Sequence, residues 1–312
     1  MSALVVERPG LLTTVQDQGR WGLQHLGVPV SGWMDDWSAR LANRLAGNRD
    51  GEALLEVTWL GPTLRAEGPM SIAIAGAVFD VTVGGFRART PLACPVAHGA
   101  TIEFGERQRG TRAYLAVRGG IAVAPVLGSR STDIRSGLGG LAGRRLQKAD
   151  RLPIGDSPTG GPDGLRNVPS PSWLGEPNLR VLRASCESAG ADDPFLRLCD
   201  AQYRLASASD RTGYRLMADR PLPEAEATLI SQPVVTGAIQ LPPGGSPLLL
   251  MADRQTTGGY AIVAVVAAVD LPPAGQLGPG DSCRFVSCTW DEARVAAADR
   301  ERSLDQIAER IG

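Results

Sequence analysis

Acidic and basic side chains are concentrated in a glycine-rich segment near the start of the sequence. Asp17 and Arg20 are followed, after a Pro-Val pair and a hydroxyl residue, by Gly32 and Asp35. A guanidinium group can hold a substrate carboxylate through two parallel hydrogen bonds, and a carboxylate can orient a polar group. Asp17, Arg20 and Asp35 are therefore the candidate catalytic residues. The alternative is an internal Arg–Asp pair that fixes the conformation of a loop.

A second segment, past the midpoint, repeats this order of residue types. Arg211 is followed by a Pro-Val pair, a hydroxyl residue, Gly237 and Gln240, which stands where the first segment has Asp35. A diverged duplication would give two related modules, with the polar residues of one facing those of the other across a single cleft. Coincidence between two glycine-rich turn segments is the alternative.

Two other segments are rich in hydrogen-bonding groups. In the first, Arg118 precedes Gly119-Gly120, and Arg130 follows between two serines. Adjacent glycines let backbone N–H groups approach an anion closely, so Arg118 and Arg130 are predicted to bind phosphate or carboxylate, with a structural turn as the alternative.

The other segment, 252–260, lies between two expected strands, and loops held on rigid strands often carry site residues. Five residues of this loop are predicted to bind substrate: Asp253, Gln255, Thr256, Thr257 and Tyr260. The other residues predicted to bind substrate are Arg118, Arg130, Arg211 and Gln240.

The composition excludes several classes of site. Histidine occurs only at His25 and His98, which excludes a multi-histidine metal site, and no metal is expected. The five cysteines form no C-x-x-C pair, so they support neither a disulfide framework nor a zinc cluster. Lys148 is the single lysine, which leaves one candidate for lysine chemistry. A net charge of −1 gives no electrostatic case for binding nucleic acid or an anionic membrane.

The sequence shows no signal-peptide pattern, and its longest apolar run, 261–269, is too short to cross a bilayer. We therefore expect a cytoplasmic protein.

Many short strands are expected to position these residues. A length of 312 residues suggests two domains, and 38 glycines and 23 prolines favour frequent turns. Alternating or β-branched runs such as 54–60 and 79–83 predict a barrel or sandwich. Helices are expected over 34–46 and from a capping-box sequence at 289–292 onward.

Three sequence blocks, in this order, resemble the allophanate hydrolase subunit 2 family. They read TTVQDQGRWG…GVPVSGWMD…RLANRLAGN, then RAYLAVRGGI…VLGSRSTD, then SDRTGYRL…GAIQLPPGGSPLLLMADRQTTGGY…PGD, and they extend over roughly residues 3–290. This family includes the C subunit of 5-oxoprolinase and the second half of the carboxyltransferase domain of urea carboxylase.

The resemblance implies a mainly β fold of two cyclophilin-like β-barrel domains, with a few short helices and a C-terminal helix. The first half is expected over 1–160, a Pro/Gly-rich linker over 161–177, the second half over 178–289 and a C-terminal helical extension over 290–312.

The resemblance also implies a subunit of an ATP-dependent 5-oxoprolinase, which opens the lactam of 5-oxoproline to glutamate. The expected partners are an allophanate hydrolase subunit 1-like protein (the B subunit of 5-oxoprolinase) and, in many members, a LamB/YcsF-like third subunit. An unstrained lactam is a poor electrophile, and phosphorylation of its oxygen by ATP makes the carbon open to attack by water. The complex is expected to use ATP, but no local motif places the ATP site on this chain.

Two other functions are consistent with the same resemblance. One is a carboxyltransferase component that acts on urea or a related amide; it would use biotin carried by a separate protein, since this chain has no Met-Lys-Met carrier motif. The other is a non-catalytic regulator that sequesters a kinase-inhibiting subunit 1 homologue.

Overall fold

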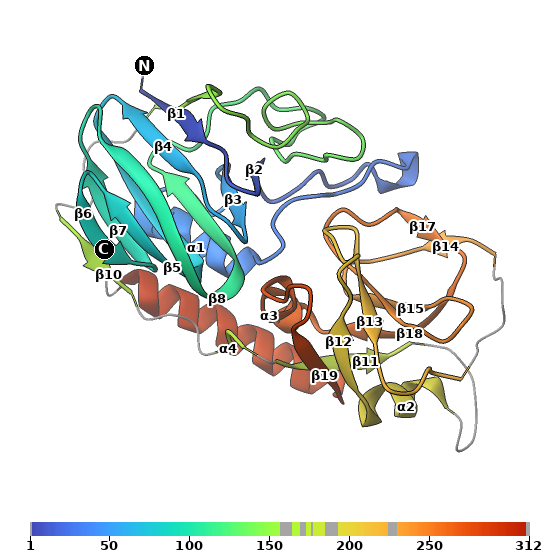
Figure 1. The fold of residues 1–312 in the computed structure, drawn as a ribbon. Coiled ribbons are helices and arrows are strands. Elements are labelled where there is room, and N and C mark those ends of the chain that lie inside the picture. Colours follow the sequence, from blue (N-terminus) through green and yellow to red (C-terminus); the bar gives the residue numbers. More distant parts are fainter. Residues whose placement is uncertain are drawn as a thin grey trace. The chain divides into compact units, whose positions relative to one another are not determined.

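The computed structural model describes residues 2–156, 164–168, 173–175, 177–184, 193–223 and 230–309. Part of the expected linker 161–177, namely 161–163, 169–172 and 176, lies outside these residues. The chain forms two compact units (Figure 1). Unit 1 comprises Met1–Arg20, Ser31–Leu174 and Leu304–Gly312, and unit 2 comprises Trp21–Val30 and Gly175–Ser303.

Unit 1 is built on a curled ten-stranded sheet whose main path runs β10-β7-β5-β8-β4-β1-β9, with β2 paired to β3, β3 to β8 and β6 to β5. The long strands β5 and β8 pair from Ile72–Val117 to Val83–Ile102 and carry much of the apolar core. The strands are β1 (Ala3–Arg8), β2 (Leu12–Gln16), β3 (Leu54–Thr58), β4 (Thr63–Glu67), β5 (Met70–Val83), β6 (Phe86–Arg89), β7 (Leu92–Val96), β8 (Thr101–Val117), β9 (Arg151–Pro153) and β10 (Arg166–Asn167).

Helix α1 (Asp36–Ala46) lies on this sheet, where the sequence predicts a helix. Asp35 caps its N-terminus and Gly47, at φ 77°, ends it in the left-handed region. Trp37, Leu41 and Leu45 share the buried face at helical spacing. The helix therefore follows from local signals at both ends and from one apolar stripe.

Unit 2 is a closed seven-stranded barrel of order β11-β18-β15-β16-β13-β12-β19. Closure removes free sheet edges. In a separate two-stranded ribbon, β17 (Thr257–Gly258), which lies in the predicted site loop, pairs with β14 (Gln232–Pro233). The barrel strands are β11 (Asn178–Arg183), β12 (Gln202–Leu205), β13 (Gly213–Met217), β15 (Ala238–Leu241), β16 (Leu248–Leu250), β18 (Ala261–Val266) and β19 (Ser282–Ser287).

The fold is completed by the short helices η1 (Gln24–Leu26), α2 (Pro194–Asp200), η2 (Ala268–Asp270) and α3 (Leu271–Gly275), and by the 20-residue C-terminal helix α4 (Trp290–Glu309). The predicted capping box starts α4, since Thr289 N donates to Glu292 Oε2 at 2.7 Å and Glu292 N donates to Thr289 Oγ1 at 3.2 Å. The expectation of a mainly β chain with barrel domains and a C-terminal helix is confirmed.

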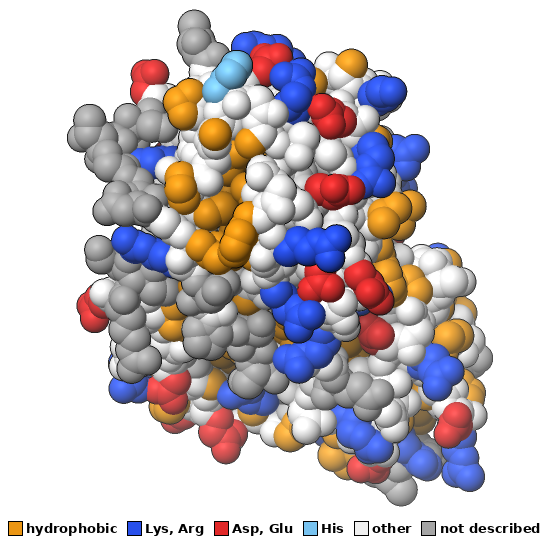
Figure 2. All heavy atoms as spheres, turned by 60° about the vertical axis from the view of Figure 1, so that its left-hand side comes forward, with side chains coloured by type: hydrophobic (Ala, Val, Ile, Leu, Met, Phe, Trp, Pro, Cys, Tyr) orange, Lys and Arg blue, Asp and Glu red, His pale blue; other side chains and the backbone are white. Residues whose placement is uncertain are grey.

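The surface carries both signs of charge. On the face drawn in Figure 2, basic side chains are interspersed with acidic ones, in keeping with the net charge of −1. The single lysine, Lys148, is exposed on a turn of unit 1 in which Gln147 N donates to Asp150 Oδ2 at 2.7 Å. The hydrogen bond from Arg144 holds the pKa of Asp150 below its usual range. No helix among the described residues combines the length and apolar character needed to span a membrane.

Candidate functional site

Asp17 follows β2 in unit 1 and anchors a loop more than a hundred residues later. Its Oδ1 accepts hydrogen bonds from Gly19 N at 2.9 Å and from the hydroxyls of Ser129 and Ser131, both at 2.6 Å. Its Oδ2 accepts from Arg130 N at 2.6 Å. A carboxylate offers about four acceptor positions, and four donors bind this one, three at Oδ1 and one at Oδ2. Asp17 is thus placed to fix the loop that carries Arg130.

Arg20 is 1% exposed and binds the same loop. Its Nε donates to Val126 O at 3.0 Å and its Nη2 donates to Ser131 O at 2.7 Å. A Cβ atom at Gly139 would lie 2.6 Å from Nη2, so a glycine is needed there for the guanidinium to fit. Asp17 and Arg20 therefore both fix loop geometry, each through its own contacts with the loop. The Nη1 atom of Arg20 is buried and has no hydrogen-bond partner among the described residues.

Three buried oxygen atoms in the same part of unit 1 also have no donor among the residues that the structure describes: Gln16 Oε1, Ser31 Oγ and Asp133 Oδ2. Gln16 Nε2 donates to the carbonyl of the residue before Asp133 at 3.0 Å, which places these two side chains together. Ser31 has φ 57°, and a Cβ on Gly32 would approach Gly19 to 3.0 Å, so this turn packs against the Asp17 segment. Buried polar atoms are almost always satisfied by protein, water or ligand. The concentration of unsatisfied atoms marks this region as a candidate binding site. Gln16, Ser31 and Asp133 were not among the site residues predicted from the sequence.

Asp35 has a different environment. Its Oδ1 accepts from Ser38 N at 2.9 Å and its Oδ2 from Ser38 Oγ at 2.6 Å, as an N-cap residue does. Its own N–H donates to Tyr114 Oη at 2.8 Å, and that hydroxyl donates to Glu56 Oε2 at 2.9 Å. Burial, with the charges of Glu56 and Asp35, raises the pKa of Tyr114. These contacts give Asp35 a structural role at the start of α1, and its catalytic role stays a prediction.

The predicted anion site at Arg118 forms a turn. Gly119 N donates to Asn48 Oδ1 at 2.9 Å, and Gly120 N donates to a carbonyl within the turn at 2.8 Å. The Arg118 side chain lies against the end of α1, since a Cβ at Gly47 would be 2.8 Å from its Nη1. The backbone N–H groups of the two glycines are therefore engaged inside the protein, which favours the structural-turn alternative.

Arg130 is half-buried, and its Nε donates to Val123 O at 2.8 Å. Its backbone is held by Asp17. The structure thus joins Arg130 to the Asp17–Arg20 region, as a member of the same cluster.

In unit 2, Arg211 and Asp253 form a buried bidentate ion pair. Arg211 Nε donates to Asp253 Oδ2 at 2.8 Å and Nη2 donates to Oδ1 at 3.0 Å. Asp253 N also donates to Arg211 O at 2.9 Å. The pair ties the predicted site loop to the segment that precedes β13.

Arg254, which the sequence analysis left out, is buried beside this pair. It is 4% exposed; its Nε donates to Val234 O at 3.3 Å and its Nη1 to Thr236 Oγ1 at 2.7 Å. Burial lowers the pKa of its guanidinium. Nothing in the residue type distinguishes a buried arginine from an exposed one, so only the tertiary structure identifies it.

Gln240 lies on β15 and is fully buried. Its Oε1 accepts from Gln255 Nε2 at 3.5 Å, while its Nε2 has no acceptor among the described residues. A Cβ at Gly258 would lie 2.4 Å from that nitrogen, so the glycine leaves room for the amide. Of the other predicted residues, Thr256 accepts from Val234 N through its carbonyl at 3.0 Å. Thr257 and Tyr260 are exposed.

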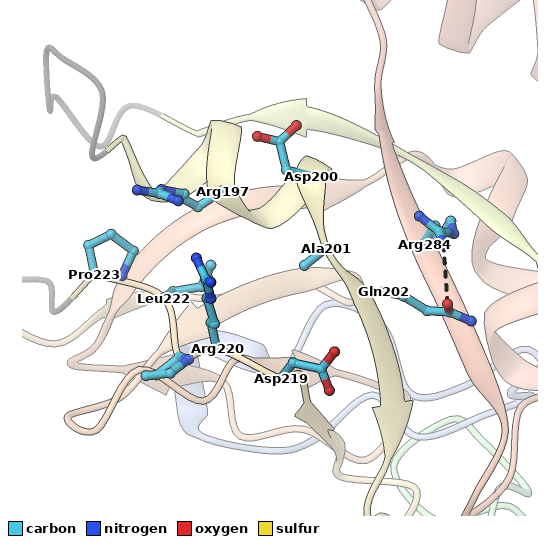
Figure 3. Close-up of a pocket in the computed structure, with 10 residues that line it drawn as sticks. Arg197, Asp200, Ala201, Gln202, Asp219, Arg220, Leu222, Pro223 and Arg284 are labelled. Atoms are coloured by element: carbon cyan, nitrogen blue, oxygen red, sulfur yellow. Dashed lines mark hydrogen bonds between the residues drawn. The ribbon is translucent and has the colours of Figure 1, made fainter.

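A pocket of about 920 Å³ opens elsewhere in unit 2. Arg197, Arg220 and Arg284 contribute to its lining, and Arg284 Nη2 donates to Gln202 Oε1 at 3.2 Å (Figure 3). These side chains are exposed, and none of the predicted site residues or unsatisfied buried atoms lies among its lining residues. We therefore treat the two buried clusters, one in unit 1 and one in unit 2, as separate candidate binding regions.

The family model described as "Carboxyltransferase domain, subdomain A and B" matches residues 26–287. The chain is 35% identical to the C subunit of 5-oxoprolinase from Escherichia coli, over 99% of this chain and 98% of the relative.

Two solved structures are also similar. The structure of TTHA0988 has a TM-score of 0.83 and 37% identity, over 92% of this chain and 56% of that chain. The Kluyveromyces lactis urea amidolyase has a TM-score of 0.86 and 31% identity, over 98% of this chain and 20% of that chain. The chain thus spans nearly the full length of the Escherichia coli relative, about half of TTHA0988 and a fifth of the urea amidolyase. The resemblance inferred from the three sequence blocks is confirmed, and the chain belongs to the carboxyltransferase domain, subdomain A and B family, together with the C subunit of 5-oxoprolinase.

Proposed function

We propose that this chain is one subunit of an ATP-dependent 5-oxoprolinase that opens 5-oxoproline to glutamate. The observation that carries the proposal is the identity of 35% with a C subunit of 5-oxoprolinase along nearly the whole length of both chains. A protein named as one subunit is part of an assembly. The partners proposed here are an allophanate hydrolase subunit 1-like protein and a LamB/YcsF-like third subunit.

The reaction makes specific demands on the chain. Phosphate transfer from ATP to the lactam oxygen, attack of water at the activated carbon and cleavage of the C–N bond yield glutamate, ADP and phosphate. The chain must hold a ring N–H, a carboxylate and the charge that develops on oxygen. Within unit 1, Gln16 Oε1 and Asp133 Oδ2 are buried acceptors suited to an N–H donor. Within unit 2, considered by itself, Arg254 supplies a buried guanidinium for an anion.

ATP is assigned to the partner subunits in this proposal. The adjacent glycines expected to cradle an anion, Gly119 and Gly120, use their N–H groups within a turn. Asp17 and Arg20 act in the proposal as positioning residues, because their contacts hold the loop of Arg130. That the polar clusters of the two modules face one another across one cleft stays a prediction.

The test begins with the chain purified from its native host together with whatever co-purifies. ADP and glutamate release are measured with and without 5-oxoproline. Release of both products that depends on 5-oxoproline supports the proposal. ADP release that ignores 5-oxoproline, with no glutamate formed, contradicts it.

The similarity to urea amidolyase favours a second candidate, transfer of a carboxyl group from biotin to urea or a related amide. That reaction needs a biotinylated carrier, so a biotinylated protein in the eluate and urea-dependent turnover would favour it. Urea itself carries no charge, so in that reaction the anion for the buried Arg254 guanidinium would be the carboxyl group carried on biotin.

A further inference from the structure

Arg254 is a buried cation that the described residues surround with neutral groups. Its hydrogen bonds go to the carbonyl of Val234 and the hydroxyl of Thr236, and no described carboxylate lies within ion-pair distance. Burying a charge without an opposite charge is costly, and buried charges are normally paired. Removal from water alone lowers the pKa of this guanidinium, with no neighbouring acid raising it. The neighbouring Arg211, by contrast, has Asp253 as its partner.

The guanidinium is held in a fixed orientation. Nε and Nη1 are bonded at 3.3 Å and 2.7 Å, so the planar fork is anchored on two of its three nitrogens. The described residues leave the Nη2 position for a ligand. The Thr236 hydroxyl accepts from Arg254, and its own proton is therefore available to donate. Thr236 is half-buried and precedes Gly237, whose φ of 87° turns the chain into β15.

A second unsatisfied donor lies in the same neighbourhood. Gln240 Nε2 is buried without an acceptor among the described residues and lies beside Gly258. Val234 connects the two donors, because its carbonyl binds Arg254 and its Cγ1 would be 3.4 Å from a Cβ on Gly258. The available groups here are N–H and O–H donors, which fit an anion with several oxygen atoms.

We propose that Arg254, with Thr236, forms a carboxylate-binding subsite, and that Gln240 lies behind it as a positioning residue. In the proposed function, on which this step rests, the subsite takes the carboxylate of 5-oxoproline. The remaining Nη2 and the Thr236 hydroxyl can each donate to one oxygen of a carboxylate, whose single charge the guanidinium neutralises. A neutral amide such as urea leaves the charge uncompensated, so the subsite selects carboxylated substrates.

The test compares two ligands that differ in the carboxylate alone. Equilibrium dialysis measures binding of 5-oxoproline and of 2-pyrrolidinone to the full chain with its co-purified subunits, in the absence of ATP. The wild type is expected to bind 5-oxoproline about 10- to 100-fold more tightly, the range for a charge-assisted hydrogen bond. The Arg254→Gln variant should lose that preference while its affinity for 2-pyrrolidinone stays the same.

Two further variants complete the test: a conservative replacement of Arg254, and a control at an arginine outside the proposed subsite. Arg254→Lys keeps the charge without the planar fork and should retain part of the preference, which covers the case in which Arg254→Gln does not fold. Arg215→Gln removes an exposed arginine of β13 and should behave as the wild type. A folded Arg254 variant with an unchanged preference overturns the subsite, as does a wild type that binds both ligands equally.

The dialysis result is independent of turnover. A complex that binds 5-oxoproline through Arg254 but releases no glutamate would retain the subsite and contradict the proposed function. If glutamate release is normal and the Arg254 variants still bind 5-oxoproline more tightly than 2-pyrrolidinone, the proposed function is retained and the subsite is contradicted.

Discussion

In each unit, a polar loop is hydrogen-bonded to a segment that carries an arginine. The carboxylate that makes this contact belongs to the segment in unit 1 and to the loop in unit 2. In unit 1 the carboxylate of Asp17 lies on the segment after β2, and the loop supplies the donors. In unit 2 the carboxylate of Asp253 lies on the loop, and Arg211 on the preceding segment supplies the donors. Both arrangements fix a loop by charge-assisted hydrogen bonds, which are the stronger kind in proteins.

The different position of the carboxylate in the two units is accompanied by a difference in the groups that each loop has available to bind a ligand. The loop arginines correspond in one respect, since Arg130 Nε binds the carbonyl of Val123 and Arg254 Nε binds the carbonyl of Val234. Arg130 is half-buried, however, whereas Arg254 is buried. The unsatisfied atoms beside the unit 1 loop are mainly oxygens, whereas Gln240 Nε2 near the unit 2 loop is a nitrogen donor. Unit 1 is therefore suited to a ligand with N–H groups and unit 2 to a ligand with an anionic group.

The largest expected effect concerns the buried ion pair of unit 2. Arg211→Met leaves Asp253 buried without its partner, and the free energy of unfolding should fall by about 3–5 kcal/mol. The double variant Arg211→Met/Asp253→Leu should recover most of this loss, since it removes the stranded charge. Chemical denaturation, with hydrogen exchange of β13 as the local readout, checks both.

Arg89→Met serves as the control, because it removes an exposed ion pair with Asp80 and should leave the denaturation midpoint unchanged. An Arg211→Met variant as stable as the wild type would contradict this account. The ion pair of the unit 2 loop would then contribute nothing to stability, and the difference from the unit 1 loop, which Asp17 holds through hydroxyl and N–H groups, would have no energetic consequence.

The next effect tests the carboxylate of unit 1. Asp17→Asn replaces one acceptor oxygen with a donor, so at least one of the four bound groups loses its acceptor, and stability should fall by about 1–3 kcal/mol. Asp133→Asn is the matched control: its Oδ2 has no donor among the described residues, so neutralising it should not destabilise the protein. Thermal unfolding of the two variants would contradict this account if Asp133→Asn cost as much as Asp17→Asn.

The smallest effect compares two glycines that occupy equivalent places in the repeated sequence order. Gly32 and Gly237 both have φ 87°, so alanine at either position should cost about 1–2 kcal/mol. The new methyl group at position 32 would lie 3.0 Å from the backbone of Gly19, whereas at position 237 it would meet a side-chain atom of Leu271 and a carbonyl oxygen at 3.1 Å. Gly32→Ala should therefore lower the melting temperature more than Gly237→Ala does. The opposite order would be evidence against the inference that the turn at Gly32 is more tightly packed than the turn at Gly237.

Features that depend on local sequence were predictable. The helix over 34–46 and the capping box at 289–292 follow from cap residues and periodicity, and the repeated sequence order led to Asp17, Arg20 and Arg211. The internal Arg–Asp pair considered for unit 1 is found in unit 2 instead, because pairing across 42 residues depends on strand packing.

The contacts of buried polar groups were beyond the reach of the sequence. Arg254 and Gln16 look like surface residues by type, and only the fold removes them from water. Gly119 and Gly120 have the composition of an anion cradle, yet Asn48 takes one of their N–H groups. In each case a partner distant in sequence decides which hydrogen-bonding groups remain available.

The position of the single lysine has a practical consequence for any study of assembly. Apart from a chain-terminal amine, an amine-reactive fluorophore attaches only to Lys148, on the exposed turn that Asp150 closes. One dye at one known place would report binding of a second protein by fluorescence anisotropy, without an engineered cysteine. Amine-directed cross-linking samples only the surroundings of that turn, so an interface elsewhere on the chain would have to be mapped with reagents that target arginine or carboxylate groups.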